Sequence, residues 1–207
     1  MKRTRFILGL LTLAAILVTL AGALAGCGKV PATHFYSLEP PAASPVGKTL
    51  PYDVAVFRFR TAYRLSQDRL VFMPAPYQVD YYNYHRWAGY PADLVTGALI
   101  TSLKRARVFR SVSEIRTGVT PDYILKGEIE NLEEVDTPGT ATARVAISLD
   151  AIDTKTRAVV WSGSAQYEKG VTSGNIDDVA RELNEGVRQT LDKLTHDIAA
   201  KFPEKRL

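Results

Sequence analysis

The chain is poor in the residues that build covalent or metal-bound sites. Cys27 is the only cysteine among 207 residues, and there are three histidines, His34, His85 and His196. A lone cysteine excludes an internal disulfide framework. Four cysteine or histidine ligands at short spacings define the common closed zinc sites, and this chain does not supply them. We therefore expect no structural metal.

Sequence motifs of catalysis and cofactor binding are also missing. The chain contains no G-x-S-x-G elbow, no H-E-x-x-H pair and no glycine-rich dinucleotide turn. Gly47-Lys48-Thr49 resembles the end of a phosphate-binding loop, but Ala42 replaces the first glycine and Pro45 removes an amide donor. We predict a protein that is not an enzyme, with no catalytic residues and no cofactor.

The net charge of +4 is concentrated in a short segment. Lys2, Arg3 and Arg5 precede a stretch without any charged residue that lasts until Lys29, so removal of the start leaves a net charge of +1. A strongly basic surface is typical of nucleic-acid binding, and a net charge of +1 gives such binding little support. We expect no nucleic-acid partner.

Residues 1–26 have the pattern of a secretory signal peptide. A basic start is followed by an apolar run from Phe6 and by small residues ending in Leu24-Ala25-Gly26-Cys27. The last four letters match a bacterial lipobox, in which the cysteine is lipidated and the signal is cut before it. The alternative is an uncleaved membrane helix, since residues 6–28 are long enough to span a bilayer. The position of the only cysteine favours the lipoprotein, with residues 27–33 as a lipidated tether.

The remaining chain, residues 34–207, predicts one domain of α/β (α+β) class. Alternating apolar residues indicate strands at 34–38, 52–59 and 69–73, a return strand at 77–82, and a meander from 123 to 167 with a bulge near Asn131. Apolar spacings of three and four indicate helices over 91–107 and from the Asn175 cap to Pro203. We expect a mainly antiparallel sheet with both helices packed on one face.

An aromatic segment is the most unusual part of this domain. Five of the ten tyrosines and one tryptophan lie between residues 77 and 90. They either pack a hairpin against the sheet or form a contact surface, since tyrosine and tryptophan are enriched at interfaces. The candidate contact residues are Tyr81, Tyr82, Tyr84 and Trp87. The acidic pairs Glu133-Glu134 and Asp177-Asp178 are interpreted as solvated surface.

Together these features resemble the auxiliary lipoproteins of ABC-type transport systems, the PqiC-like components of MCE- and Mla-type systems. The resemblance is carried by the lipobox, Phe35-Tyr36-Ser37-Leu38, the segment Tyr82-Asn83-Tyr84-His85-Arg86-Trp87, the helix start Pro91-Ala92-Asp93-Leu94-Val95, Phe109-Arg110-Ser111-Val112 and Val160-Trp161. It implies a small α/β domain without catalytic residues. Only Cys27 transfers by position, as the site of lipid attachment.

The resemblance also implies partners and a location. Such proteins accompany a permease, an ATPase and an MCE-type substrate-binding protein that move lipids or other apolar compounds between two membranes. Gly28, in place of aspartate, suggests that the lipid anchor holds the protein at the outer membrane, facing the periplasm, rather than at the inner membrane. Assembly into a homo-oligomer is left open, as is the transported compound. The alternative function is an outer-membrane lipoprotein that regulates cell-wall synthesis or envelope assembly.

Overall fold

A computed structural model describes residues 30–42, 44–115, 118, 120–137, 139–171 and 175–203. The chain divides into residues 1–32 and a second unit, residues 33–207, which forms a folded domain. The elements of this domain, in chain order, are β1 (His34–Tyr36), β2 (Leu50–Val56), β3 (Arg60–Thr61), the short 3-10 helix η1 (Tyr63–Leu65), β4 (Arg69–Ala75), β5 (Gln78–Trp87), α2 (Pro91–Arg105), β6 (Phe109–Glu114), β7 (Tyr123–Thr137), β8 (Thr140–Asp153), β9 (Val159–Val171) and α3 (Ile176–Lys201).

Strand β7 organises the sheet. Along one edge it pairs with β8 over its whole length, and β8 pairs with β9, both antiparallel. Along the other edge β7 pairs in turn with β2, β3 and β4, all of them parallel to it. Strand β6 then adds to β2, and β5 and β1 add to β4. One long strand is thus shared by three short ones.

The expectation of a mainly antiparallel sheet is wrong, because the sheet is mixed. Five of the strand pairs are parallel: β1–β5, β2–β6, β2–β7, β3–β7 and β4–β7. The β4–β5 hairpin and the β7–β8–β9 meander are antiparallel as predicted. The predicted bulge is present, since the pairing of β7 with β8 shifts between Ile129 and Asn131. The α+β class holds.

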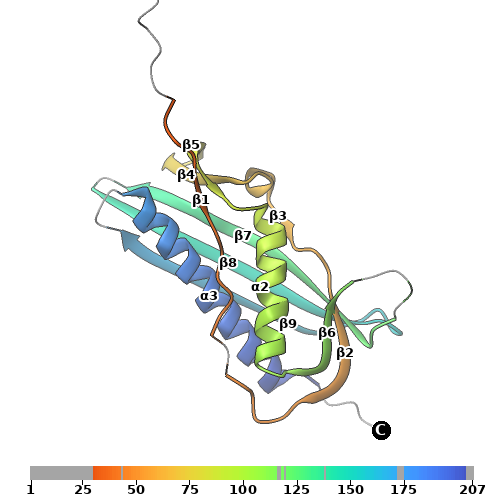
Figure 1. Ribbon diagram of the computed structural model, residues 1–207. Coiled ribbons are helices and arrows are strands. Elements are labelled where there is room, and N and C mark those ends of the chain that lie inside the picture. Colours follow the sequence, from red (N-terminus) through yellow and green to blue (C-terminus); the bar gives the residue numbers. More distant parts are fainter. Residues whose placement is uncertain are drawn as a thin grey trace, which may run out of the picture. The chain divides into compact units, whose positions relative to one another are not determined.

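Both helices cover one face of the sheet, as predicted, and Figure 1 shows them side by side on that face. Helix α3 begins at the predicted cap, where the Asn175 side chain accepts a hydrogen bond from the amide of Asp177. Its apolar stripe includes Leu183 and Leu194, both fully buried. Gly186 allows α3 to approach the sheet closely, because a Cβ there would lie 2.7 Å from Tyr167 and Val145. The core lies between this helix layer and the sheet.

Candidate functional site

The aromatic segment forms β5, and the structure separates its members. Trp87 is 1% exposed and is one of the largest fully buried side chains. Tyr81 and Tyr82 are half-buried and pack against the core, whereas Tyr84 is exposed. Side chains alternate between the two faces of a strand, so Tyr84 and Trp87, three residues apart, point in opposite directions. Trp87 therefore belongs to the core and is left out of the contact surface.

On the helix side of the sheet, polar groups tie β1 to the start of α3. The Tyr36 hydroxyl donates a hydrogen bond of 2.5 Å to Asp177 Oδ1 and lies 2.7 Å from His85 Nδ1. Because the single hydroxyl proton goes to the carboxylate, His85 donates from Nδ1. Burial and the Asp177 carboxylate raise the pKa of the Tyr36 phenol, and burial lowers the pKa of His85. The cluster fixes the entry strand to a helix 141 residues away in sequence.

The interpretation of Glu133 and Glu134 as solvated surface is wrong, because both are buried. Glu134 is 5% exposed and accepts a 2.6 Å hydrogen bond from the Tyr82 hydroxyl. The ring of Phe72 lies 4.6 Å from that of Tyr82, centre to centre. Burial raises the pKa of Glu134, and the neighbouring Asp136 carboxyl adds to the effect. Tyr82 thus supports a buried acid and is not free to serve a partner with its hydroxyl.

Glu133 lies on the opposite side of β7 and is neutralised there. Arg64, from η1, places its Nε 2.6 Å from Glu133 Oε2, and the Asn131 side-chain amide donates to Oε1 at 2.8 Å. Arg64 also donates to the backbone oxygen of Glu130. A buried carboxylate requires such partners, since an isolated one is very costly to desolvate. The ion pair between Arg64 and Glu133 holds η1 on the sheet.

The raised pKa of Glu134 predicts a specific dependence of stability on pH. A carboxyl whose folded-state pKa lies above its unfolded value contributes stability that is complete below the unfolded pKa and is lost as pH rises through the folded pKa. We expect the free energy of unfolding of Glu134→Gln to fall less than that of the wild type as pH rises from about 4.5, the ordinary pKa of this carboxyl. Urea unfolding measured across this pH range tests it. Parallel curves for the two proteins would show that Glu134 titrates normally.

The face of the sheet opposite the helices carries an exposed aromatic pair at its β1 edge. Tyr36 is aligned with buried Trp87, so its neighbour Phe35 points to the other face, where Tyr84 also lies. Phe35 is 64% exposed and Tyr84 is 37% exposed. We call Phe35 and Tyr84 the outer aromatic pair. Phe35 was not among the predicted contact residues, because its register against β5 cannot be derived from the sequence.

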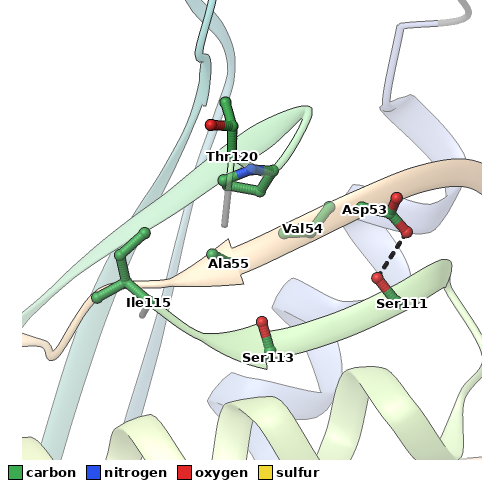
Figure 2. Close-up of a pocket in the computed structure, with 8 residues that line it drawn as sticks. Asp53, Val54, Ala55, Ser111, Ser113, Ile115 and Thr120 are labelled. Carbon is green, nitrogen blue, oxygen red and sulfur yellow. Dashed lines mark hydrogen bonds between the residues drawn. The ribbon is translucent and has the colours of Figure 1, made fainter. Parts of the chain in front are cut away.

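A pocket of about 360 Å³ lies between β2, β6 and the segment before β7. Figure 2 shows Asp53 and Ser111 joined across it, with Ser113, Ile115 and Thr120 along its wall. Arg110 donates two hydrogen bonds to the Asp53 carboxylate, and the Ser111 hydroxyl donates a third. These bonds lower the pKa of Asp53 to about 2. A carboxylate so fully engaged is a poor general base and a poor metal ligand.

Within the described ranges, no group of three or more histidine, cysteine, aspartate or glutamate side chains is placed to hold a metal ion. In the same part of the chain, none of the helices has the length and apolar character needed to cross a membrane. Cys27, the predicted site of lipid attachment, and the signal peptide lie outside the described residues.

Comparison with protein families gives a match that spans the folded unit. A family model described as "ABC-type transport auxiliary lipoprotein component" matches residues 36–199. No curated protein matches the chain.

Two solved structures share the fold, and a third is less similar. A Xanthomonas campestris protein of the DUF330 family is 15% identical, with a TM-score of 0.71 over 81% of this chain and 95% of that one. An uncharacterised protein is 12% identical, with a TM-score of 0.59 over 81% and 99%. The PelC dodecamer from Paraburkholderia phytofirmans is 13% identical, with a TM-score of 0.44 over 74% and 94%, a likeness too weak to bear on the assembly of this chain. At these identities the likeness shows the fold alone.

Proposed function

Because the chain belongs to the family of ABC-type transport auxiliary lipoprotein components, we propose that it is a non-enzymatic, lipid-anchored partner of a transporter in a bacterial envelope. The anchor is Cys27, and the domain faces the periplasm from the outer membrane. The partners are a permease, an ATPase and an MCE-type substrate-binding protein, and the transported compounds are lipids or other apolar molecules.

The family match over residues 36–199 carries this proposal, since it covers the folded unit almost completely. The chemistry of the described residues agrees with it. The Asp53 pocket has its carboxylate saturated, and the buried acids Glu133 and Glu134 are held by structural partners.

Anchoring by Cys27 suits such a role physically. One acyl chain gives only marginal membrane binding, whereas two or more give stable attachment, at about 0.8 kcal/mol for each buried methylene group. A lipobox cysteine carries three chains. The domain would then stay at the membrane without a spanning helix and present its sheet to a partner.

We propose the outer aromatic pair as the contact with the transporter. Phe35 and Tyr84 are exposed on the sheet face that the helices leave uncovered. Aromatic side chains often carry most of the energy of an interface, about 2 kcal/mol or more each. Tyr81 lies on the same strand and is half-buried, so it supports the pair rather than leading the contact.

We expect Phe35→Ala and Tyr84→Ala to weaken co-purification of the MCE-type protein from detergent-solubilised envelopes while leaving the fold intact. A loss of about 2 kcal/mol corresponds to roughly a thirtyfold weaker complex. Their free energies of unfolding should change by no more than about 0.5 kcal/mol, because both side chains are on the surface. The measurement pairs quantitative pull-down with thermal unfolding of each variant.

Tyr63→Ala is the matched control, since Tyr63 is 88% exposed and belongs to η1, not to β1 or β5. If the control weakens the complex as much as the two variants do, the outer aromatic pair is not the contact. If wild-type protein brings down cell-wall synthases instead of transporter components, the transport role itself is wrong.

A further inference from the structure

The turn between β4 and β5 holds an exposed residue in a costly conformation. Ala75 pairs with Gln78, so Pro76 and Tyr77 form a two-residue turn. Tyr77 has a φ of 68° and is fully exposed. Proline followed by a residue with positive φ is the pattern of a type II turn, in which glycine or asparagine normally takes the second place. A tyrosine there adds strain and packs on nothing, so the fold does not explain it.

The β4–β5 turn itself carries no charge. Residues 73–79 include no charged side chain. Strand register brings the β7–β8 connection and the end of β9 to the same end of the sheet. Met73 of β4 is aligned with Val135 of β7, and Ala141 of β8 is aligned with Val171 of β9. Residues 139–142 and 171, at these strand ends, are likewise uncharged, and Asp80 and Asp136 border the uncharged stretches. In Figure 1 the β4–β5 turn, the β7–β8 end and the start of α3 lie toward one end of the sheet.

The opposite end of the sheet is charged. Tyr123, at the start of β7, pairs with Asp153, at the end of β8. The described segments that flank this pair contain Asp122, Lys155 and Arg157. Moving a charged side chain below the headgroups is costly, so the uncharged β4–β5 turn suits insertion better than the charged ends of β7 and β8.

Strand β1 begins at the end of the sheet that holds the β4–β5 turn. Strand β1 runs parallel to β5, with His34 aligned to His85, so the chain before His34 comes from the side on which β5 begins. Cys27 is seven positions before His34, and Gln78 is seven positions before His85. At about 3.3 Å per residue the tether extends no more than about 23 Å from His34, the same length that β5 covers to the turn. Acyl chains on Cys27 and the side chain of Tyr77 can therefore meet one membrane surface.

We infer that the β4–β5 turn, led by Tyr77, inserts into the headgroup region of the membrane to which Cys27 is anchored, and so sets the orientation of the domain. This inference rests on the lipid anchor proposed above. Tyrosine suits the site, because its ring enters the apolar boundary while its hydroxyl stays among headgroups and water. Val79, exposed beside the turn, adds apolar surface. The outer aromatic pair then stands away from the lipid, where a partner reaches it.

The test places a tryptophan at the turn of the lipidated protein. The two native tryptophans, Trp87 and Trp161, are buried, so Tyr77→Trp adds an exposed reporter. In phosphatidylcholine–phosphatidylglycerol vesicles with brominated acyl chains and no transporter, we expect the added fluorescence to be quenched. Val79→Trp serves as a second reporter, and Tyr63→Trp, in η1, is expected to remain unquenched. Equal signals at all three positions, or none, would overturn the inference.

Two further results separate this inference from the function on which it rests. Mass spectrometry of the same samples shows whether Cys27 is acylated: a free thiol overturns both proposals, whereas an acylated protein without quenching overturns the turn contact alone. In Tyr77→Gly we expect the melting temperature to stay unchanged or rise, because glycine adopts this φ without strain. A marked fall would give Tyr77 a structural role and contradict the inference.

Discussion

Trp87→Ala is expected to lower the free energy of unfolding by about 3–5 kcal/mol. The indole is 1% exposed and lies within the core cluster that joins the sheet to the helices. Its removal loses the transfer free energy of a large aromatic side chain and leaves a cavity, which a close-packed interior fills only in part. Urea unfolding of a chain that begins at Gly28 measures the loss directly.

Tyr84→Ala is the matched control for this change, because it truncates an aromatic side chain three residues away on the other face of β5. The two variants should differ by several kcal/mol. Similar losses at both positions would mean that β5 does not have the alternation described, and that Tyr84 belongs to the core as well.

Cys27→Ser is expected to abolish lipidation and to change where the protein resides. Without the thiol no thioether to a diacylglycerol forms, so the precursor is not cut before residue 27. The apolar run of residues 6–26 is long enough to remain in a bilayer, and the uncut precursor should therefore stay in the inner membrane. Membrane fractionation and intact-mass measurement of wild type and variant test both consequences.

A serine substitution at the surface of the domain, such as Thr101→Ser, provides the processing control and should leave the acylated mature form unchanged except for the mass of the substitution. An unmodified thiol on residue 27 of the wild-type protein would contradict the lipoprotein assignment. So would normal outer-membrane recovery of Cys27→Ser.

Local features of the fold could be predicted from sequence because each depends on neighbouring residues. Asn175 caps α3, and Pro203 lies just beyond its end, as expected from helix-capping preferences. The bulge near Asn131 was visible because apolar alternation changes phase there. The β4–β5 hairpin followed from a turn sequence between two short apolar runs.

Strand direction could not be predicted, because alternation has the same period in parallel and antiparallel pairs. Nothing within residues 50–75 indicates that β2, β3 and β4 share one edge of a strand that begins at Tyr123. The buried acids were hidden for a similar reason. Glu134 is bound by Tyr82, 52 residues earlier, and Glu133 by Arg64, 69 residues earlier. Charge in sequence predicts exposure unless the distant partner is known.

The candidate site was located in part. The aromatic segment proved to be a single strand, in which some side chains are buried and others are exposed. This difference comes from the alternation of side chains along the strand, since Trp87 points inward and Tyr84 points outward. Phe35 was missed because only its pairing next to β5 makes it part of a surface. Composition identified the region, and register decided which side chains are available.

The sharing of one edge of β7 by β2, β3 and β4 also sets an order of assembly. The β7–β8–β9 meander closes through short turns, whereas β2 pairs with residues that come about 70 positions later in the chain. Closing such long loops costs entropy before any contact repays it, and it slows folding. In a chain that enters a compartment with its amino end first, the edges of β2, β3 and β4 that face β7 therefore stay open until β7 arrives. During that interval these strand edges can pair with the wrong partners. An exported chain must therefore fold quickly or be bound by a chaperone.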